Sequence, residues 1–454
     1  LTLTNSTLEH SAQYGVYVKS TNHLIRGNRF NAITSYAVYN GDPQNLLVVA
    51  ENNWWGSYSG PRPLGSGNGV NYRTCYNNIL KITYVCQLYV DVDPWTGKDY
   101  YTRQVYGQRV RWQYYDADPV NTANGNYAYS LTDLSIPIKG DLDFAFQRSY
   151  NSLDPSLTGV MGYGWQHNYQ IKVEEETDHV LVTYGDGAVG RFEVAETGYQ
   201  TPVGNYDTLS KEADGTFRLL RKDQTRYAFD GIGRIVTIQD RNGHGLVFNY
   251  LGTNLSTIRD TGGRTLLAFT YTDSRLTQIS EVISRTVTYT YDENDNLSSV
   301  TDVDGGLTTF TYDTNHRLLT ITDANGHTYL TNEYDPEGRV LKQWDAEGYT
   351  TEFFYNTLDY DTHVTDRRGY ITKYDYDELG RLLNITNPLN HVTSYTFDAN
   401  NNITSITDPR GFSTSYTYDE KGNRLTTIDA LSGVTAITYD TLNNPLTVTE
   451  ARSA

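Results

Sequence analysis

Cysteine, methionine and basic residues are scarce in this chain, and each shortage narrows what the protein can be. The 454 residues include two cysteines and one methionine, and the two cysteines have no histidine nearby, which makes a poor zinc site. Lysine and arginine number 36 against 54 acidic residues, so the formal net charge is −18. Binding to nucleic acid or to an anionic membrane needs basic patches, so we expect neither a nucleic-acid partner nor insertion into a membrane.

Helical periodicity and familiar catalytic motifs are also missing. No long stretch repeats its apolar residues with the period of a helix, which favours an all-β fold. No Ser-His-Asp motif, Cys-His pair or phosphate loop stands out. We therefore expect a protein that is not an enzyme and that uses no cofactor and no metal ion.

The second half of the chain contains a regular repeat. Between residues 229 and 439 an aromatic residue, usually tyrosine and usually followed by aspartate, recurs at intervals of 20 to 22 residues. These anchors of the repeat are Phe229, Tyr250, Tyr271, Tyr291, Tyr312, Tyr334, Tyr355, Tyr376, Phe397, Tyr418 and Tyr439. So steady a period indicates a repeat architecture in which each unit buries its apolar face against its neighbours.

Each unit contains two turn signals. Four residues after the anchor, nine units place a residue type that tolerates a left-handed backbone: Gly233, Asn254, Asp295, Gly338, Asp359, Gly380, Asn401, Gly422 and Asn443. About seven residues later comes an acidic or amide residue, typically followed after three positions by Gly or Asn, as in Asp366–Gly369. Runs rich in Thr, Ile, Val and Leu separate the turns, so each unit is predicted to be a β-hairpin.

A second aromatic residue precedes the anchor by two positions in nine units. These residues are Tyr227, Phe248, Phe269, Tyr289, Phe310, Phe353, Tyr374, Tyr395 and Tyr416. Residues i and i+2 lie on one face of a strand, so stacked units would carry two aromatic ladders on one face of a continuous sheet. Tyrosine hydroxyls need partners when they are buried, and their abundance here favours faces that are half wet.

The complete phrase of the repeat appears in Tyr376-Asp377-Glu378-Leu379-Gly380-Arg381-Leu382 and again from Tyr418 to Leu425. It resembles the YD repeats of Rhs-family proteins and their relatives, including the tyrosine-rich shells of insecticidal toxin complexes and teneurins. The resemblance implies a β-sheet spiral that winds into a hollow shell, often around a C-terminal toxin domain. For residues 229–454 we therefore expect eleven units of such a spiral, forming a partial open shell.

Residues 119–228 supply a second resemblance. The motifs Thr132-Asp133-Leu134-Ser135-Ile136-Pro137, Arg148-Ser149-Tyr150-Asn151 and Gly162-Tyr163-Gly164-Trp165 occur in order. They resemble the domain that commonly introduces Rhs repeats in secreted bacterial proteins. Leu142, Phe144 and Phe146 alternate with less apolar residues, as in a half-buried strand, so this region is predicted to be a β-rich linking domain.

The first 96 residues contain a different repeat. Leu3, Leu8 and Tyr17 recur 22 residues later as Ile25, Phe30 and Tyr39, which indicates coils of a parallel β-helix. Asn52-Asn53-Trp54-Trp55-Gly56 resembles the closing coil of right-handed, pectate-lyase-like β-helix proteins. Residues 1–96 are thus predicted to be its C-terminal coils, and residues 97–118 a connector. An active lyase would need clustered acids, but residues 1–72 hold only Glu9, Asp42 and Glu51, with Lys19, Arg26 and Arg29 nearby.

Cys75 and Cys86 lie in an insertion before the last strand of this helix. Asn77 and Asn78, between strand-like flanks, would fold a hairpin that brings the two cysteines within bridging range. A disulfide is the favoured interpretation in an extracellular protein, and two buried free thiols are the alternative.

Two classes of function fit the sequence. The chain starts within one pattern and stops within another, so we expect an internal piece of a larger bacterial protein, secreted or on the cell surface. It would be a non-enzymatic shell segment whose partner is a C-terminal effector or toxin domain of the same full-length protein. The alternative is a carbohydrate-binding adhesin whose β-helix and tyrosine-rich repeats contact glycans. A shell predicts aromatic residues turned inward, whereas an adhesin predicts an exposed aromatic stripe.

Overall fold

The computed structural model describes residues 113–142, 144–154, 158–282, 285–356 and 359–451, and the backbone of the strands within the first 91 residues. In these parts of the chain every regular element is a β-strand, which confirms the all-β prediction. No helix in the described ranges is long and apolar enough to cross a membrane. The chain divides into two compact units, one of Leu1–Gln104 with Thr357–Asp359 and the other of Val105–Asn356 with Tyr360–Ala454.

The first unit contains parallel strands. One sheet joins β1 (Thr2–Thr4), β4 (His23–Arg26), β7 (Val48–Val49) and β11 (Val90–Asp91), another joins β2 (Thr7–Glu9) and β5 (Arg29–Asn31), and a third joins β3 (Tyr14–Val18), β6 (Tyr36–Asn40) and β8 (Gly69–Val70). Their register pairs Leu3 with Ile25, Leu8 with Phe30 and Tyr17 with Tyr39. The residues that recur in the sequence are therefore neighbours in parallel strands. That these strands are coils of a β-helix stays a prediction.

The two cysteines lie on a hairpin. It consists of β9 (Tyr72–Asn77) and β10 (Ile82–Gln87), and its antiparallel register pairs Cys75 with Tyr84 and Cys86 with Arg73. The side chains of Cys75 and Cys86 lie outside the described residues, so the disulfide also stays a prediction.

Small antiparallel sheets form the linking domain. They pair β12 (Tyr115–Asp116) with β13 (Val120–Asn121), β14 (Ala128–Ile136) with β15 (Phe144–Asn151) and β18 (Trp165–His167), and β16 (Thr158–Gly159) with β17 (Gly162–Tyr163). A four-stranded sheet follows, of β19 (Lys172–Glu175), β20 (His179–Thr183), β21 (Val189–Val194) and β22 (Tyr199–Gln200). Phe144 and Phe146 are buried and alternate with half-buried residues, as the sequence predicts.

The rest of the chain is one antiparallel sheet of 24 strands in sequence order. The strands are β23 (Thr208–Lys211), β24 (Phe217–Leu220), β25 (Arg226–Phe229), β26 (Ile235–Gln239), β27 (Gly245–Leu251), β28 (Asn254–Asp260), β29 (Thr265–Thr272), β30 (Arg275–Glu281), β31 (Thr286–Tyr291), β32 (Leu297–Thr301), β33 (Leu307–Tyr312), β34 (Leu318–Thr322), β35 (Thr328–Tyr334), β36 (Val340–Asp345), β37 (Thr350–Asn356), β38 (Asp361–Thr365), β39 (Ile371–Tyr376), β40 (Leu382–Thr386), β41 (Val392–Phe397), β42 (Ile403–Thr407), β43 (Ser413–Tyr418), β44 (Arg424–Ile428), β45 (Val434–Tyr439) and β46 (Pro445–Ala451). The predicted hairpins are confirmed. The sheet begins at Thr208, whereas the repeats were predicted to begin at residue 229. The first hairpin, β23 and β24, lacks the aromatic–aspartate phrase and so could not be recognised from the sequence.

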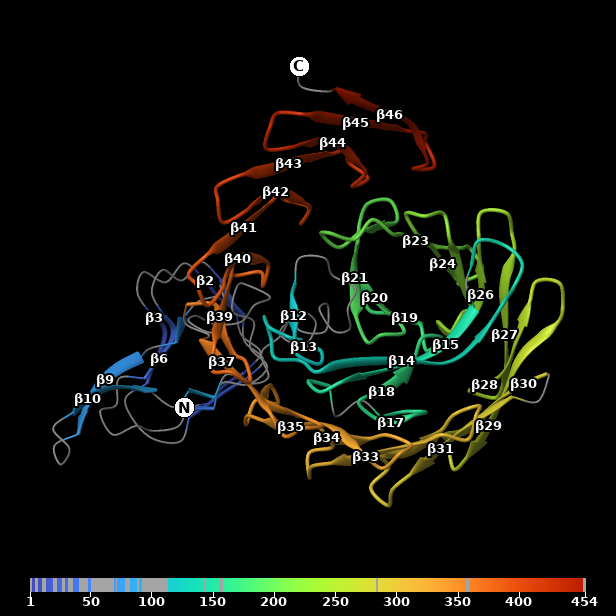
Figure 1. The fold of residues 1–454 in the computed structure, drawn as a ribbon, viewed down its shortest axis with the longest axis horizontal. Coiled ribbons are helices and arrows are strands. Elements are labelled where there is room, and N and C mark those ends of the chain that lie inside the picture. Colours follow the sequence, from blue (N-terminus) through green and yellow to red (C-terminus); the bar gives the residue numbers. More distant parts are fainter. Residues whose placement is uncertain are drawn as a thin grey trace. The chain divides into compact units, whose positions relative to one another are not determined.

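The sheet curves around β14, β15 and β18 (Figure 1). A sheet with one apolar face is stable only when that face is covered, and here the linking domain covers it. The ladder residues Phe248, Phe269, Tyr289, Phe310 and Phe353 are buried in one core with the side chains of the linking domain. The ladders between β27 and β39 therefore face inward.

A buried ion pair fixes the linking domain to the sheet. The Nε atom of Arg148 donates to Asp133 Oδ1 at 2.9 Å, and the Tyr289 hydroxyl donates to Asp133 Oδ2 at 2.8 Å. The Arg148 guanidinium lies 5.0 Å from the ring centre of Trp165 and 5.3 Å from that of Phe310. Removal of one partner of such a pair leaves an uncompensated buried charge, which typically costs about 3–5 kcal/mol.

Burial of the inner face ends near Leu382. From there to residue 450, Asn423 is the buried residue among those described, and Tyr395 and Tyr416 are half-buried. Tyr395 of β41 still packs against the core, but no described part of the chain buries the inner face of β42 to β46, which fits the predicted partial open shell.

The last strand of the sheet generates a prediction about association. β46 pairs with β45 and, within the described residues, with no other strand, and its Leu446 and Val448 are 64% and 62% exposed. Unpaired edge strands recruit other strands, so light scattering should show a mass that rises with protein concentration. Proline at Thr447 or at Val448 should reduce this rise, because neighbouring residues of a strand point their N–H groups to opposite sides. A monomer at all concentrations would contradict the prediction.

Candidate functional site

The structure places all eleven anchors at equivalent points of the sheet. Each lies at the last or the penultimate residue of an alternate strand from β25 to β45. We call the turn that follows an anchor the first turn and the other turn of the unit the second turn. The first turns all lie along one rim of the sheet, the first-turn edge, and the second turns along the opposite rim, the second-turn edge.

The hydroxyl group explains why the anchor is tyrosine. In six units it donates to the carbonyl oxygen of the residue fifteen positions earlier, at the start of the preceding strand. The donor–acceptor pairs are Tyr250–Ile235 (2.9 Å), Tyr291–Leu276 (2.7 Å), Tyr312–Leu297 (2.7 Å), Tyr355–Val340 (2.8 Å), Tyr418–Ile403 (2.8 Å) and Tyr439–Arg424 (3.0 Å). Burial raises the pKa of Tyr250 to about 12, so its hydroxyl keeps its proton at neutral pH.

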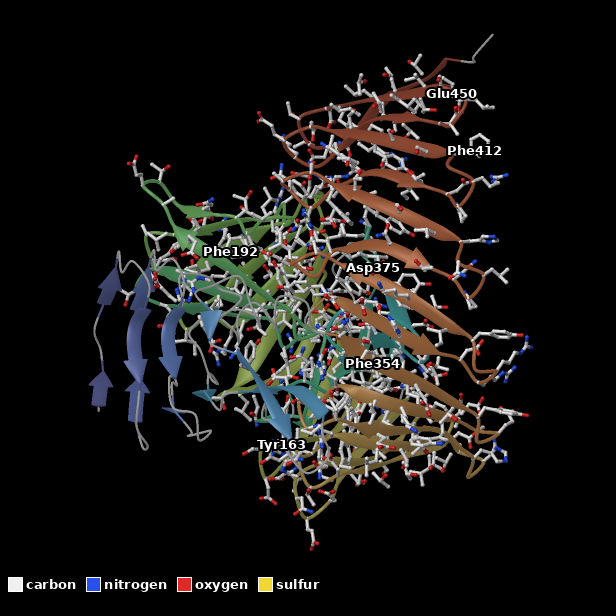
Figure 2. All side chains as sticks on the ribbon, turned by 90° about the vertical axis from the view of Figure 1, so that its left-hand side faces the viewer. Tyr163, Phe192, Phe354, Asp375, Phe412 and Glu450 are labelled. Atoms are coloured by element: carbon white, nitrogen blue, oxygen red, sulfur yellow. The ribbon has the colours of Figure 1, made fainter. Side chains whose placement is uncertain are left out.

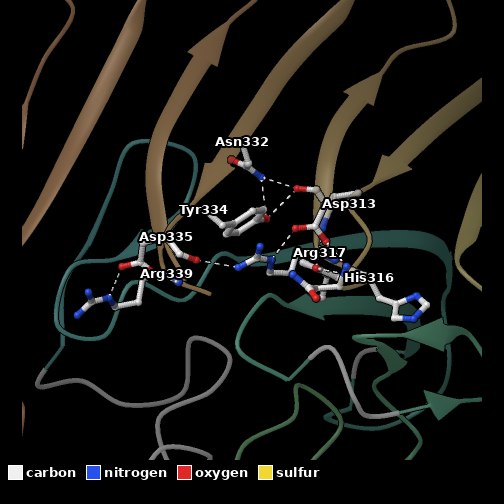
Figure 3. Close-up of polar contacts among 10 residues, drawn as sticks. Asp313, His316, Arg317, Asn332, Tyr334, Asp335 and Arg339 are labelled. Carbon is white, nitrogen blue, oxygen red and sulfur yellow. Dashed lines mark hydrogen bonds and ion pairs between the residues drawn. The ribbon is translucent and has the colours of Figure 1, made fainter. Parts of the chain in front are cut away.

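The aspartate after the anchor caps the first turn. Asp313 Oδ1 accepts the backbone N–H groups of Asn315 and Arg317, each at 2.9 Å, and Asp313 Oδ2 accepts Arg317 Nε at 2.7 Å (Figure 3). His316 occupies the left-handed position of this turn with φ 63°. The carboxylate thus satisfies the amides that the tight turn leaves without a strand partner.

The arginine of the cap also reaches the next unit. Arg317 Nη1 donates to the carbonyl oxygen of Asp335 at 2.8 Å, and the guanidinium lies 5.1 Å from the Tyr334 ring centre (Figure 3). Equivalent arginines stack on the next anchor at Arg234–Tyr250 (4.4 Å), Arg339–Tyr355 (4.9 Å) and Arg381–Phe397 (5.2 Å). The unit of Tyr312 is thus bonded to the unit before it through the anchor hydroxyl and to the unit after it through Arg317. The sequence analysis missed this role, although the arginine five residues after these anchors was visible.

The predicted first turns are correct at seven of nine positions. Asn254 and Asp359 do not take the left-handed backbone, which falls instead on Gly252 and Tyr360. Tyr250 is followed by Leu251 rather than by aspartate, so no carboxylate caps this turn and the strands close through a two-residue loop. The left-handed His316 was not foreseen.

Two further acidic turns are capped in the same way. Asp292 Oδ1 accepts the backbone N–H groups of Asn294 and Asn296, each at 2.9 Å, and Asp398 does the same for Asn400 and Asn402. No group of three or more His, Cys, Asp or Glu in the described part of the chain is arranged to hold a metal ion.

Residues of the linking domain cover the first-turn edge. The backbone N–H of Val173 donates to Gly233 O at 2.9 Å, that of Leu276 to Val160 O at 2.8 Å, and that of Val340 to Gly125 O at 3.0 Å. The Tyr150 hydroxyl accepts the N–H of Leu318 at 2.8 Å. Residues that precede the repeats therefore bond to the edge at the turns after β25, β29, β33 and β35.

The first turns of the last three units meet the beginning of the sheet in a contact that we call the seam. Lys222 Nζ donates to Gly422 O at 2.6 Å, and Asn443 Nδ2 donates to Lys222 O at 2.9 Å. Tyr206 and Arg241 donate to Asn402 Oδ1 (2.9 Å) and Asn444 Oδ1 (3.0 Å). The bonded residues are 196 to 221 positions apart, so about ten units carry the sheet through one revolution.

Comparison with known proteins agrees with this architecture. Residues 117–192 match the family model of a domain of unknown function, DUF6531. Residues 272–307, 291–328, 362–392, 376–413 and 397–435 match the RHS repeat model. The chain therefore contains RHS repeats behind a DUF6531 domain.

Curated relatives share part of the chain. The tRNA nuclease WapA of Bacillus subtilis strain 168 is 32% identical over 140 residues, which are 30% of this chain and 6% of that protein. The tRNA3(Ser)-specific nuclease WapA of Bacillus spizizenii gives the same values. The match thus spans a small part of each relative.

Among solved structures, the chain is similar to TcdB2-TccC3 without its hypervariable C-terminal region, with 10% identity and a TM-score of 0.37. The similarity covers 72% of this chain and 21% of the TcdB2-TccC3 chain. A Photorhabdus luminescens Tc holotoxin pore with a mutated TccC3 gives 14% identity and a TM-score of 0.39, over 82% and 24% of the two chains.

The anchor hydroxyl generates a paired prediction. Tyr355→Phe removes the bond to Val340 and should lower the free energy of unfolding by about 1 kcal/mol. Phe397→Tyr should stabilise, because the pattern places its new hydroxyl at the carbonyl of Leu382. Chemical denaturation measures both changes, and hydrogen exchange should confine each to its own and adjacent units. Equal effects on exchange from β25 to β45 would contradict nearest-neighbour coupling.

Proposed function

We propose that this RHS-repeat protein is a structural segment of a β-sheet shell that carries or encloses a C-terminal effector or toxin domain of the same full-length protein. The observation that carries the proposal is the seam, by which one continuous sheet returns to its own beginning after about ten units. A sheet that closes on itself in this way surrounds an interior. The linking domain fills that interior beside β27 to β39, and no described residue buries the inner face of β42 to β46.

The direction of the aromatic residues supports a shell. Four ladder residues, Phe248, Phe269, Phe310 and Phe353, are buried inside the curve of the sheet. Ladders turned inward fit a container, whereas a binding stripe for glycans would need them outside. The half-buried Tyr416 of the open face would then contact enclosed cargo.

The segment itself would be non-enzymatic and would belong to a secreted or cell-surface protein. Its aspartates act as turn caps in unit after unit, as Asp313, Asp335 and Asp377 show. The catalytic activity in the names of the WapA relatives concerns proteins of which the match covers 6%, so an effector elsewhere in the full-length protein is the natural carrier of any activity.

A glycan-binding adhesin is the second candidate, and one observation favours it. Tyr349, Tyr370 and Phe412 occupy the same position of three second turns and are 52%, 56% and 49% exposed. Exposed rings at regular spacing can stack on sugars. Retardation of the protein in gels that contain soluble polysaccharide, lost in Tyr370→Ala, would support this candidate against the shell.

The shell proposal predicts protection of the effector. In the full-length protein, limited proteolysis should leave the effector domain intact. Lys222→Glu should expose it, because that change removes the donor to Gly422 O and opens the seam. Arg218→Glu is the matched control, since the charge change is the same but Arg218 lies on β24 away from the seam, bonded to Glu212. Digestion of the effector at equal rates in wild type and Lys222→Glu would overturn the proposal.

A separate prediction concerns the first 96 residues. Purified protein should neither hydrolyse nor eliminate polysaccharide, because acids are sparse in residues 1–72. Turnover of a uronate polymer, measured by the absorbance of unsaturated products, would contradict this if Lys19→Ala, Arg26→Ala or Arg29→Ala abolished it.

A further inference from the structure

The two edges of the sheet differ in what covers them. Gly233, Leu276, Leu318 and Val340 on the first-turn edge bond to the linking domain, and the turns of the last three units bond to the seam. The second-turn edge beyond Asp345 presents exposed apolar side chains in five successive units, namely Tyr349, Tyr370, Leu389, Phe412 and Leu431. Exposed apolar side chains of the first-turn edge, such as Ile232, Leu251 and Leu379, are more scattered. Figure 2 shows Phe412 at the end of its strands, where the hairpins stack above one another.

The seam shows how a second-turn edge holds a first turn. The Tyr206 ring lies against Gly422, so closely that a Cβ atom on this glycine would lie 2.3 Å from the ring. Lys222 Nζ lies 5.2 Å from the centre of the same ring and donates to the Gly422 carbonyl. The seat thus consists of an aromatic ring that packs on the turn glycine and a cation that bonds to the glycine's carbonyl oxygen.

The same aromatic–cation pair recurs on the exposed edge. The guanidinium of Arg367 lies 5.3 Å from the Tyr349 ring centre, and that of Arg410 lies 5.1 Å from the Phe412 ring centre. Ion pairs with Asp345 and Asp408 hold the two guanidinium groups at the turns. Both pairs have the composition of the Tyr206–Lys222 seat, with the ring exposed.

We propose that the Tyr349–Arg367 and Phe412–Arg410 pairs are seats for a further layer of YD hairpins, which docks through its first turns. Each ring would pack on a turn glycine and each guanidinium would donate to that glycine's carbonyl oxygen. The separations at the seam, 196 to 221 residues, set the spacing between a seat and the turn that it holds. This inference rests on the proposed shell and names the partner of its free edge.

Charge complementarity fits this partner. First turns of this repeat are acidic beyond the capping aspartate, as Glu337, Glu378 and Glu420 show. The seats supply cations, so a turn that docks there brings carboxylates beside Arg367 and Arg410. Apolar Leu389 and Leu431 extend the contact between and beyond the seats.

The chemistry of the seat can be tested in the existing chain. Gly422→Ala should displace the Tyr206 ring and accelerate hydrogen exchange several-fold in residues 206–226 and 419–444. Gly411→Ala is the matched control, because Gly411 has a similar positive φ of 85° but no atom within 4 Å of an added Cβ. If Gly422→Ala and Gly411→Ala changed hydrogen exchange at the seam equally, backbone strain alone would explain both effects. The proposed contact between the Tyr206 ring and the turn glycine would then be wrong.

The exposed seats can be tested in a chain that is lengthened after Ala451 by a second copy of its own units. Hydroxyl-radical labelling of Tyr349 and Phe412 should fall several-fold relative to the original chain. Arg410→Glu with Phe412→Ser should lower the melting temperature of the lengthened chain by more than that of the original chain, in which it removes the ion pair with Asp408 alone. Phe354→Ser, which alters an exposed ring of β37 away from the turns, is the control.

The outcomes separate this inference from the shell itself. If labelling of Tyr349 and Phe412 does not change on lengthening, the seats are wrong. If the effector is nevertheless protected from protease in the full-length protein, the shell stands. If the double variant destabilises the original chain as much as the lengthened one, the residues serve their own hairpins and the inference also fails.

Discussion

A tyrosine hydroxyl that is buried against a sheet must find an acceptor, and in this protein the acceptor lies in the preceding strand. In six units that constraint joins the hairpin to the one before it, as Tyr355 does with Val340. The capping aspartate then fixes the turn, and the arginine of the cap joins the hairpin to the one after it. The curvature, the inward ladder and the seam all depend on units that are held to both neighbours.

The linking domain gives the sheet a surface to fold against. The hydrogen bond from Trp165 Nε1 to the Tyr312 hydroxyl, at 2.8 Å, and the buried Arg148–Asp133 pair place polar contacts of defined direction inside an apolar interface. Such contacts are costly unless they are complete, so they favour one arrangement of domain and sheet over its neighbours.

The sequence alone predicted the features that depend on neighbouring residues of the chain. Period and turn residues predicted the hairpins and the two aromatic ladders on one face, because each signal lies within about twenty residues of its effect. The left-handed backbone predicted at Asn254 and Asp359 was wrong, because in a turn without its aspartate cap another residue can take the left-handed conformation. The partners of Tyr206, Lys222 and Arg241 could not be predicted, since they lie some 200 residues away and follow from the curvature of the whole sheet. The prediction of two ladders on one face did not show what would cover that face.

The residues that cover the first-turn edge are synthesised before the turns that they cover. The groups of the linking domain and of the seam that bond to this edge, from Gly125 and Val160 to Tyr206 and Lys222, precede in the chain the turns that they hold. A ribosome that releases the protein from its N-terminus would therefore present each new hairpin with a finished surface to settle on. Growth of the sheet would then follow translation, with the cover of each first turn already made when the turn emerges. A circular permutant that began within the repeats would lose this order and would expose its aromatic face until the linking domain emerged.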